Sequence, residues 1–346
     1  MLRRQNESRC VPVHPRSALV ERRRAFTKLE LIVSLSIIGL LAALVLPAIL
    51  ASRAASRRQY CANNLRQVGV ALHGFEAEHR KFPPGISPDP PFVSRIDGNG
   101  SSGWISPWAY LLAYLDQPVL GRAAPLRGLS PVWDPAIEVP GELAHIVPVL
   151  RCPADRQSEK ARPGCNYRAC FGVGPSEFSG GAFQPIRLMR ADEIRDGLAH
   201  TIGVSERLIG SYSPTAADPQ RDLWFSGIGA VNSGRIDADA MRIGCDSYQV
   251  GADTFPYMGS TWLIAGWLHT GYNHVARPNE RVMDCDTLSF GHAAPSTAMV
   301  TARSLHAGGV NSLYMDGHVV FMSEQIDLYV WRALATRDGL ERVSAP

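Results

Sequence analysis

The sequence predicts an α+β protein in which one long N-terminal helix, membrane-spanning in its first half, packs on a mainly antiparallel, β-rich globular domain. Two observations lead to this class. An uncharged apolar run, residues 31–51, is followed by an amphipathic stretch that ends at the sequence FPPG, residues 82–85. Beyond it, short aromatic or β-branched segments alternate with Gly, Pro, Asn and Asp, as in strands joined by turns. We therefore divide the chain into a basic leader, 1–25, a helix, 26–80, and a β-rich domain, 81–346.

The leader is the most basic part of the chain. It holds seven arginines and two glutamates, about +5, whereas the whole chain carries +3, so the remainder carries about −2. A basic nucleic-acid surface is therefore not indicated for the folded part, and we expect no nucleic-acid partner. Arginines beside an apolar run instead indicate the cytoplasmic side of a membrane.

The apolar run predicts a single membrane span at about residues 29–51. Residues 31–51 carry no charge, and as a helix at about 1.5 Å per residue they cover roughly 30 Å, the thickness of a bilayer core. A secretory signal peptide is one alternative, but its apolar core is usually only about 7 to 15 residues long. A buried helix of a soluble protein is another, but such helices seldom lack polar residues on every face.

The helix is expected to continue beyond the membrane as an amphipathic segment. Its apolar residues recur at spacings of four, three, four and three, which form one stripe along a helix. The stripe should pack on the globular domain, and the paired prolines and glycine of FPPG should end the helix. The stripe consists of Cys61, Leu65, Val68, Leu72 and Phe75.

The chain has seven cysteines and no CxxC pair, which makes zinc-ribbon and thioredoxin-like sites weak interpretations. If the leader with Cys10 is removed and the rest is exported, six cysteines remain in an oxidising compartment. They permit up to three disulfides in 15 full pairings that the sequence does not rank. These six are Cys61, Cys152, Cys165, Cys170, Cys245 and Cys285.

The stretch RRRAFTKLELIVSLSIIGLLAALVLPAIL resembles the N-terminal cleavage and methylation segment of type IV pilins and type II secretion pseudopilins. The resemblance implies that a prepilin peptidase cuts between Ala25 and Phe26 and that Phe26 becomes the N-methylated first residue. Gly39 and the helix-interior Pro47 fall in register with the same pattern. Two residues depart from it: Ala25 stands where Gly is usual, and Lys28 replaces an apolar residue.

Glu30 places a carboxylate at the edge of the apolar run. After the cut, Phe26 carries a new α-amino group, and Glu30 of a neighbouring subunit would supply the opposite charge in a low-dielectric environment. The matching glutamate of pilins is assigned this assembly role. The alternative is that Glu30 lies at interfacial depth and reaches water, with Lys28 too close along the helix to pair with it.

Segments along residues 22–340 resemble, in order, a pilin-like family known as domain of unknown function 1559. Its C-terminal signature corresponds to His306 followed by Asp316 and Gly317. The Asp-Gly pair lies between two apolar stretches and predicts a β-hairpin with a two-residue type I′ turn. Because some pseudopilins bind calcium, a calcium or other metal site at Asp316 or His306 is an alternative to a purely structural role. The sequence lacks the acidic ligand cluster that calcium requires, so we expect no cofactor.

No GxSxG, HExxH, Walker or dinucleotide-binding motif occurs in the sequence. This absence favours a protein that is not an enzyme, and the resemblance to pilins implies a pilin-like subunit of the bacterial inner membrane, with a cytoplasmic N terminus and a periplasmic or extracellular domain. Its expected partners are prepilin peptidase, other pilin-like subunits and the membrane. Two alternatives remain: a permanently tethered binding protein, and a tethered hydrolase that uses His306, Asp316 and a serine.

Overall fold

The structure is a computed structural model of the 346-residue chain. It describes residues 27–87, 105–116, 145–159, 163–176, 178–226, 237–248, 253–287 and 297–341. The leader and the expected cleavage position between Ala25 and Phe26 lie outside the described residues. The chain divides into two compact units, Met1–Ala51 and Ser52–Pro346.

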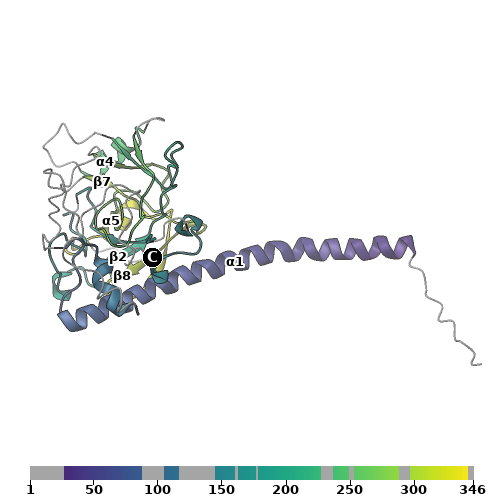
Figure 1. Cartoon of the computed structure of the whole chain (residues 1–346), viewed down its shortest axis with the longest axis horizontal. Helices are drawn as coiled ribbons and strands as arrows, with labels where there is room; N and C mark the ends of the chain where they lie inside the picture. The colour runs from purple at the N-terminus through teal and green to yellow at the C-terminus, as the bar shows by residue number, and fades with distance from the viewer. Residues whose placement is uncertain are drawn as a thin grey trace, which may run out of the picture. The chain divides into compact units, whose positions relative to one another are not determined.

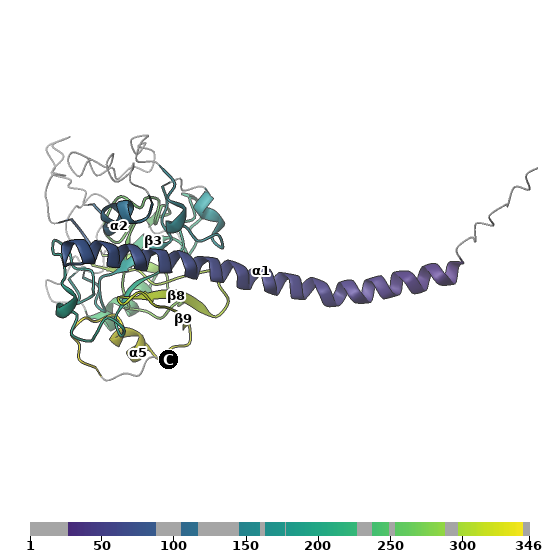
Figure 2. The same cartoon turned by 90° about the horizontal axis from the view of Figure 1, so that it is seen from below.

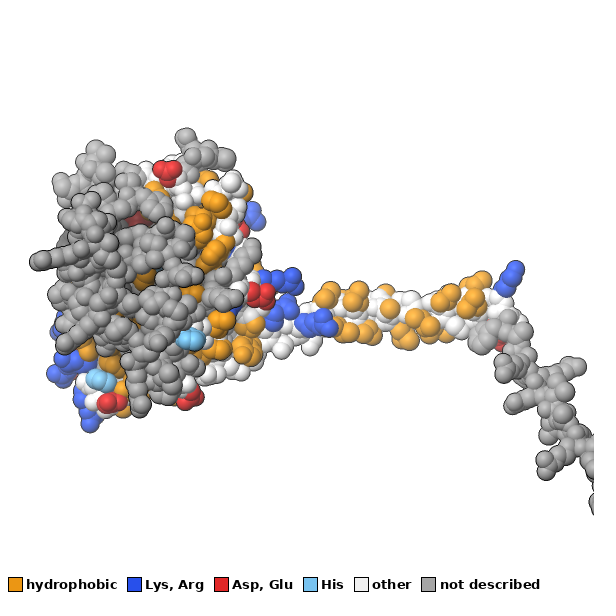
Figure 3. All heavy atoms as spheres, viewed as in Figure 1, with side chains coloured by type: hydrophobic (Ala, Val, Ile, Leu, Met, Phe, Trp, Pro, Cys, Tyr) orange, Lys and Arg blue, Asp and Glu red, His pale blue; other side chains and the backbone are white. Residues whose placement is uncertain are grey.

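Helix α1 (Lys28–His79) begins in the first unit, close to the start expected from the sequence. Its side chains through residue 60 are exposed, and Pro47 lies within the helix without ending it. Figure 3 shows apolar side chains spread over the visible face of this segment, with basic side chains at either end of the apolar stretch. Among the described residues, α1 alone is long and apolar enough for a single membrane span or signal anchor. This exposure does not fit a buried core helix.

In the second unit, the predicted apolar stripe of α1 is confirmed, since all five of its residues are buried. Figures 1 and 2 show this part of the helix alongside β8 (Gly309–Tyr314). A Cβ atom on Gly69 would lie 3.0 Å from Leu313 and 3.2 Å from the backbone of Gly317. A glycine at this position therefore lets the helix approach the sheet closely.

The larger sheet has five strands in the order β5-β1-β2-β8-β9. Its neighbouring strands are antiparallel except for β1 and β5, which are parallel. The fold is α+β and mainly antiparallel, as predicted. The remaining strands of this sheet are β1 (Tyr167–Cys170), β2 (Ile202–Glu206), β5 (Gly271–Tyr272) and β9 (Val319–Ser323).

The smaller sheet has four strands in the order β4-β3-β6-β7. Its central pair, β3 and β6, is parallel, and both outer pairs are antiparallel. The strands are short, as expected for a segment rich in turn residues. They are β3 (Leu223–Phe225), β4 (Thr254–Phe255), β6 (Asp284–Asp286) and β7 (Ala298–Met299).

Short helices connect the strands and begin at polar caps. Ser106, Asp237 and Asp327 each accept a hydrogen bond from a backbone N–H in the first turn of the helix that follows. The short helices are α2 (Pro107–Leu111), α4 (Ala238–Cys245), α5 (Leu328–Ala333) and the 3₁₀ turns η1 (Leu112–Tyr114), η2 (Pro148–Leu150), η3 (Arg156–Glu159) and η4 (Ala191–Glu193).

The predicted Asp-Gly hairpin is confirmed, but the predicted turn type is wrong. Strands β8 and β9 pair in antiparallel register, and the backbone N–H of Gly317 donates to the carbonyl of Tyr314. Gly317 has φ +96°, whereas Asp316 does not adopt a positive φ. This geometry corresponds to a three-residue loop with a left-handed glycine, not to a two-residue type I′ turn. The Asp316 carboxylate stabilises the loop by accepting the backbone N–H of His318 at 3.1 Å.

A buried ion cluster joins the two sheets. Arg207 follows β2 of the larger sheet and lies 2.8 Å from the carboxylate of Asp284, in β6 of the smaller sheet. Arg303 lies 2.9 Å from the other oxygen of the same carboxylate, and all three side chains are fully buried. One carboxylate thus contacts two guanidinium groups, and the three groups together leave a net positive charge inside the protein.

Four of the six cysteines form two disulfides, Cys61–Cys152 and Cys245–Cys285. The second disulfide joins the end of α4 to β6 within a small apolar cluster of the smaller sheet. Cys165 and Cys170 are free and buried. Burial raises the pKa of each of these two thiols to about 12, so they remain protonated and unreactive.

Candidate functional site

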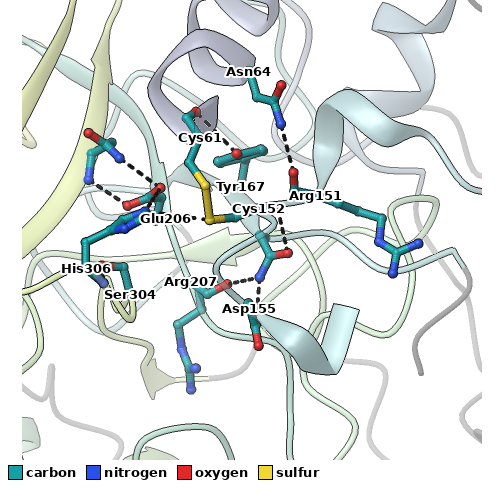
Figure 4. Close-up of a disulfide and its surroundings, with 12 residues drawn as sticks. Cys61, Asn64, Arg151, Cys152, Asp155, Tyr167, Glu206, Arg207, Ser304 and His306 are labelled. Carbon is teal, nitrogen blue, oxygen red and sulfur yellow. Dashed lines mark hydrogen bonds and ion pairs between the residues drawn. A yellow bond between two sulfur atoms is a disulfide. The ribbon is translucent and has the colours of Figure 1, made fainter. Parts of the chain in front are cut away.

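The most unusual group of side chains surrounds the Cys61–Cys152 disulfide (Figure 4). Cys61 is the first buried residue of α1, and Cys152 lies just after η2. The Tyr167 hydroxyl donates to the backbone carbonyl of Cys61 at 3.2 Å, and the Asn64 amide donates to the carbonyl of Arg151 at 2.8 Å. These bonds fix the helix and the loop on both sides of the disulfide.

Asn166 holds the loop that carries Cys152 through its side-chain amide. The Asn166 side-chain oxygen accepts the backbone N–H of Cys152 at 3.0 Å. Its amide nitrogen donates to Asp155 at 2.9 Å and to the backbone carbonyl of Arg207 at 3.2 Å. The position of the Cys152 sulfur is thus determined by a buried polar network.

His306 and Glu206 complete the site on the other side of the disulfide. The Nε2 atom of His306 lies 3.6 Å from the Cys152 sulfur and 3.2 Å from Oε1 of Glu206. Glu206 ends β2, and Asn311 in the adjacent strand β8 donates to its carboxylate twice, from the backbone at 2.7 Å and from the side chain at 3.0 Å. The backbone N–H of His306 donates to Ser304 at 3.0 Å. Hydrogen bonds therefore orient both the imidazole and the carboxylate.

Glu206 is the acidic side chain of the site. Its side chain is only 2% exposed, and among the described residues His306 is the only basic side chain within ion-pair distance of it. The neighbouring Arg207 instead pairs with Asp284. Buried carboxylates are normally compensated by hydrogen bonds or by a cation, and here Asn311 supplies two hydrogen bonds to Glu206.

Two hollows lie beside the site. A small cavity is bordered by Cys152, Glu206 and Leu305, among others. A wider surface depression is bordered by Leu305, Arg156 and Arg221. Leu305 borders both hollows and is 54% exposed.

One ligand atom each from Cys61, Cys152, Glu206 and His306 lies within 4.8 Å of all the others. Thiolate, imidazole and carboxylate are the ligands that zinc takes in proteins. The rest of the described chain contains no second group of three or more such side chains in this arrangement. The sequence analysis did not identify this group, because the residues come from α1, a loop, the end of β2 and the segment before β8, without metal-ligand spacing.

The residues of the C-terminal signature lie in two separate places. His306 belongs to the group formed by Cys61, Cys152, Glu206 and His306, called the disulfide site below. Asp316 and Gly317 form the hairpin turn beyond the other end of β8. That strand has six residues, about 20 Å in length. His306 and Asp316 therefore lie near opposite ends of β8 and do not lie side by side. The Asp316 carboxylate is also engaged locally, 2.5 Å from Nδ1 of His318.

Glu30 has a local role that the sequence analysis missed. The backbone N–H and the hydroxyl of Thr27 donate to the same oxygen of Glu30, at 2.9 and 3.0 Å, and the backbone N–H of Glu30 donates to the Thr27 hydroxyl at 3.2 Å. This reciprocal arrangement is a capping box at the start of α1. The T-x-x-E spacing was the signal that could have revealed it. Gly39, also singled out from the sequence, has open space around it.

A family model described as "Protein of unknown function (DUF1559)" matches residues 51–329, which is most of the chain. The matched range includes all four residues of the disulfide site and the C-terminal signature. No curated protein and no solved structure matches the chain.

Proposed function

The chain belongs to the family of proteins of unknown function DUF1559, and we propose that it is a non-enzymatic, pilin-like subunit anchored in the bacterial inner membrane. It is made as a prepilin, cut between Ala25 and Phe26 by a prepilin peptidase, and methylated on Phe26. It then assembles with other pilin-like subunits in a type II secretion or type IV pilus-like system. The observation that carries this proposal is the exposed apolar helix that starts at a Thr27-x-x-Glu30 cap.

The apolar surface of this helix requires a cover other than water. Large aliphatic side chains from residue 29 to residue 50 are 43–71% exposed. Each fully buried aliphatic side chain gains about 1.5–3 kcal/mol, so a lipid bilayer, and later the helices of neighbouring subunits, stabilise the segment strongly. A segment that accepts either environment suits a subunit that leaves the bilayer for a filament.

Glu30 can cap its own helix and still pair with a neighbour. Both donors of Thr27 contact Oε2, which leaves Oε1 without a partner among the described residues. A carboxylate accepts up to about four hydrogen bonds. In the proposed assembly, the α-ammonium of Phe26 from the next subunit donates to Oε1, while the capping box stays intact.

The two disulfides support an extracytoplasmic position for the globular unit. Disulfides form and persist in oxidising compartments and are rare in the bacterial cytoplasm. In the sequence, the basic leader precedes the apolar run, and the cysteines of both disulfides follow it. The proposed topology therefore has a cytoplasmic N terminus and a periplasmic or extracellular domain.

Mass spectrometry of the mature N terminus tests the processing step. We expect a chain that begins with N-methylated Phe26 when the protein is expressed with a prepilin peptidase. Full-length chains that still begin with Met1, or chains cut at another bond, would contradict the prepilin proposal. A Phe26→Pro variant provides the matched control, because proline removes the amide N–H at the bond to be cut.

Two variants at the helix start separate assembly from capping. Glu30→Gln keeps an oxygen for the Thr27 donors but removes the charge, so we expect normal cleavage and a loss of crosslinked oligomers. Thr27→Ala removes the capping box but keeps the carboxylate, so oligomers should persist. Equal crosslinking in wild type and Glu30→Gln would instead favour a permanently tethered binding protein.

A further inference from the structure

We propose that Cys61, Cys152, Glu206 and His306 form a zinc site when the disulfide between the two cysteines is reduced. The site alternates between two exclusive states, a disulfide and a four-ligand Zn²⁺ centre. The inference concerns the globular unit and does not depend on how the chain is processed or assembled.

The distances around His306 match a zinc tetrahedron. Zinc binds sulfur at about 2.3 Å and nitrogen or carboxylate oxygen at about 2.0–2.2 Å. In a tetrahedron, these lengths place an imidazole nitrogen about 3.3 Å from a carboxylate oxygen and about 3.6 Å from a sulfur. The observed distances from Nε2 of His306 are 3.2 Å to Glu206 and 3.6 Å to Cys152. Both distances from Nε2 of His306 therefore already match those of a tetrahedral site, and the other ligand atoms lie within 4.8 Å of one another.

Both sulfur ligands become available when the disulfide is reduced. A dithiol reductant supplies two electrons and two protons, the S–S bond breaks, and the reductant becomes a disulfide while Cys61 and Cys152 become thiols. Zn²⁺ then displaces one proton from each thiol, and these two protons pass to solvent. The two thiolates must separate to about 3.8 Å in a tetrahedral site, which rotation of the Cys61 side chain can provide.

The exchange adds no net charge to the buried site. The two sulfurs become thiolates and contribute two negative charges, and Zn²⁺ contributes two positive charges. Because the metal and its sulfur ligands together are neutral, the surrounding network does not have to rearrange.

The surroundings hydrogen-bond the carboxylate of Glu206 and the backbone at two of the other ligands. Asn311 orients the carboxylate of Glu206 with two donors, at 2.7 and 3.0 Å. Asn166 fixes the backbone at Cys152, and Ser304 fixes the backbone of His306. Such partners orient the ligands and typically change metal affinity by about 10- to 100-fold. A small cavity borders two of the ligands, Cys152 and Glu206.

Cobalt binding to the full-length protein tests the proposal. The protein is purified in detergent with a histidine-free tag, reduced with dithiothreitol, and freed of reductant without oxygen. Titration with Co²⁺ should give one equivalent per chain, with tetrahedral d–d bands and thiolate-to-cobalt charge-transfer absorption. The oxidised protein should show neither. Zn²⁺ should displace the cobalt and remove the bands.

Matched variants identify the ligands. Cys61→Ser/Cys152→Ser should abolish the charge-transfer absorption, whereas Cys245→Ser/Cys285→Ser, which removes the other disulfide, should retain it. Glu206→Gln, examined in reduced protein, should lose the tetrahedral bands.

Asn311→Ala tests the supporting shell and should weaken Co²⁺ binding by about 10- to 100-fold. Tryptophan emission and circular dichroism of each oxidised variant establish that it is folded.

Three results would overturn the proposal. The first is charge-transfer absorption that persists without Cys61 and Cys152. The second is reduced wild-type protein that binds Co²⁺ only octahedrally or not at all. The third is reduced protein that loses its native tryptophan emission even when Zn²⁺ is present, since the four ligands then do not remain together.

Discussion

Asp284 provides the sharpest test of how the two sheets are held together. Its carboxylate accepts Arg207 at 2.8 Å, Arg303 at 2.9 Å and the backbone N–H of Thr301 at 3.1 Å, and all three charged side chains are fully buried. In Asp284→Asn the amide keeps the shape but loses the charge. Whichever way the amide is turned, its NH₂ group faces a guanidinium donor, so two buried cations lose their compensation.

The expected loss of stability in Asp284→Asn follows from this geometry. Removal of one partner from a buried ion pair typically destabilises a protein by about 3–5 kcal/mol. A value of about 4 kcal/mol corresponds to roughly a thousandfold change in the folding equilibrium. For a unit of this size, the midpoint of thermal unfolding should fall by roughly 10 °C. Asp239→Asn is the matched control, because Asp239 pairs with Arg332 at 2.8 Å but is 69% exposed; it should cost less than about 1 kcal/mol.

Thermal unfolding of the full-length protein, followed by tryptophan emission at neutral pH, measures both variants. Although burial raises the pKa of Asp284, Arg303 and Arg207 outweigh this effect and hold it below its ordinary value of 3.8. Its ionised form therefore stabilises the fold above that value, and the contribution is lost as the pH falls through the lower folded-state pKa. The gap between wild type and Asp284→Asn should narrow in strong acid. Equal midpoints for Asp284→Asn and Asp239→Asn at neutral pH would refute the reasoning.

Three further predictions concern the globular unit. Burial lowers the pKa of both His269 and His274 to about 3, whereas the histidines of the unfolded chain take up protons below about pH 6.5. Acidification from pH 7 to pH 5 should therefore lower the free energy of unfolding by about 2 kcal/mol for each histidine, and melting curves over this range measure the loss. Gly309→Ala should destabilise the β8–β9 hairpin by roughly 1–3 kcal/mol in urea denaturation, since a Cβ there would lie 1.9 Å from a backbone carbonyl of β9. Replacing Cys245 and Cys285 by serine opens a crosslink across 40 residues and should cost about 4 kcal/mol in the same assay.

Local patterns in the sequence predicted the elements that depend on local forces. The stripe of α1 was predicted because a helix repeats its buried positions every 3.6 residues, and all five stripe residues are buried. The hairpin was predicted because Asp-Gly favours a tight reversal. Its turn type was not, since the turn type depends on where pairing between β8 and β9 stops.

The disulfide site could not be predicted from local patterns. Cys61 and Cys152 are 91 residues apart, and Glu206 and His306 are 100 residues apart. They meet because β2 and β8 are neighbours in the sheet and α1 packs against residues of β1 and β8. This strand order is not encoded in any short segment. His306 was singled out only through its family signature, and Glu206 had no sequence signal. The pairing of the cysteines likewise required the fold.

The position of the Cys61 crosslink fits the proposed anchoring. A subunit held by residues 29–51 receives any pulling force at the N-terminal end of the helical segment that packs on the domain. Before residue 61, contact with the domain includes Arg58 lying over the ring of Phe321 at 4.7 Å, an interaction worth about 0.5–1 kcal/mol at an exposed site.

Cys61 is the first buried residue of α1. A noncovalent stripe loaded from one end separates one residue at a time, so a crosslink at its first buried position protects every later contact. A disulfide and a zinc ion would both provide that link, which gives a mechanical reason for the two states of one site to share Cys61.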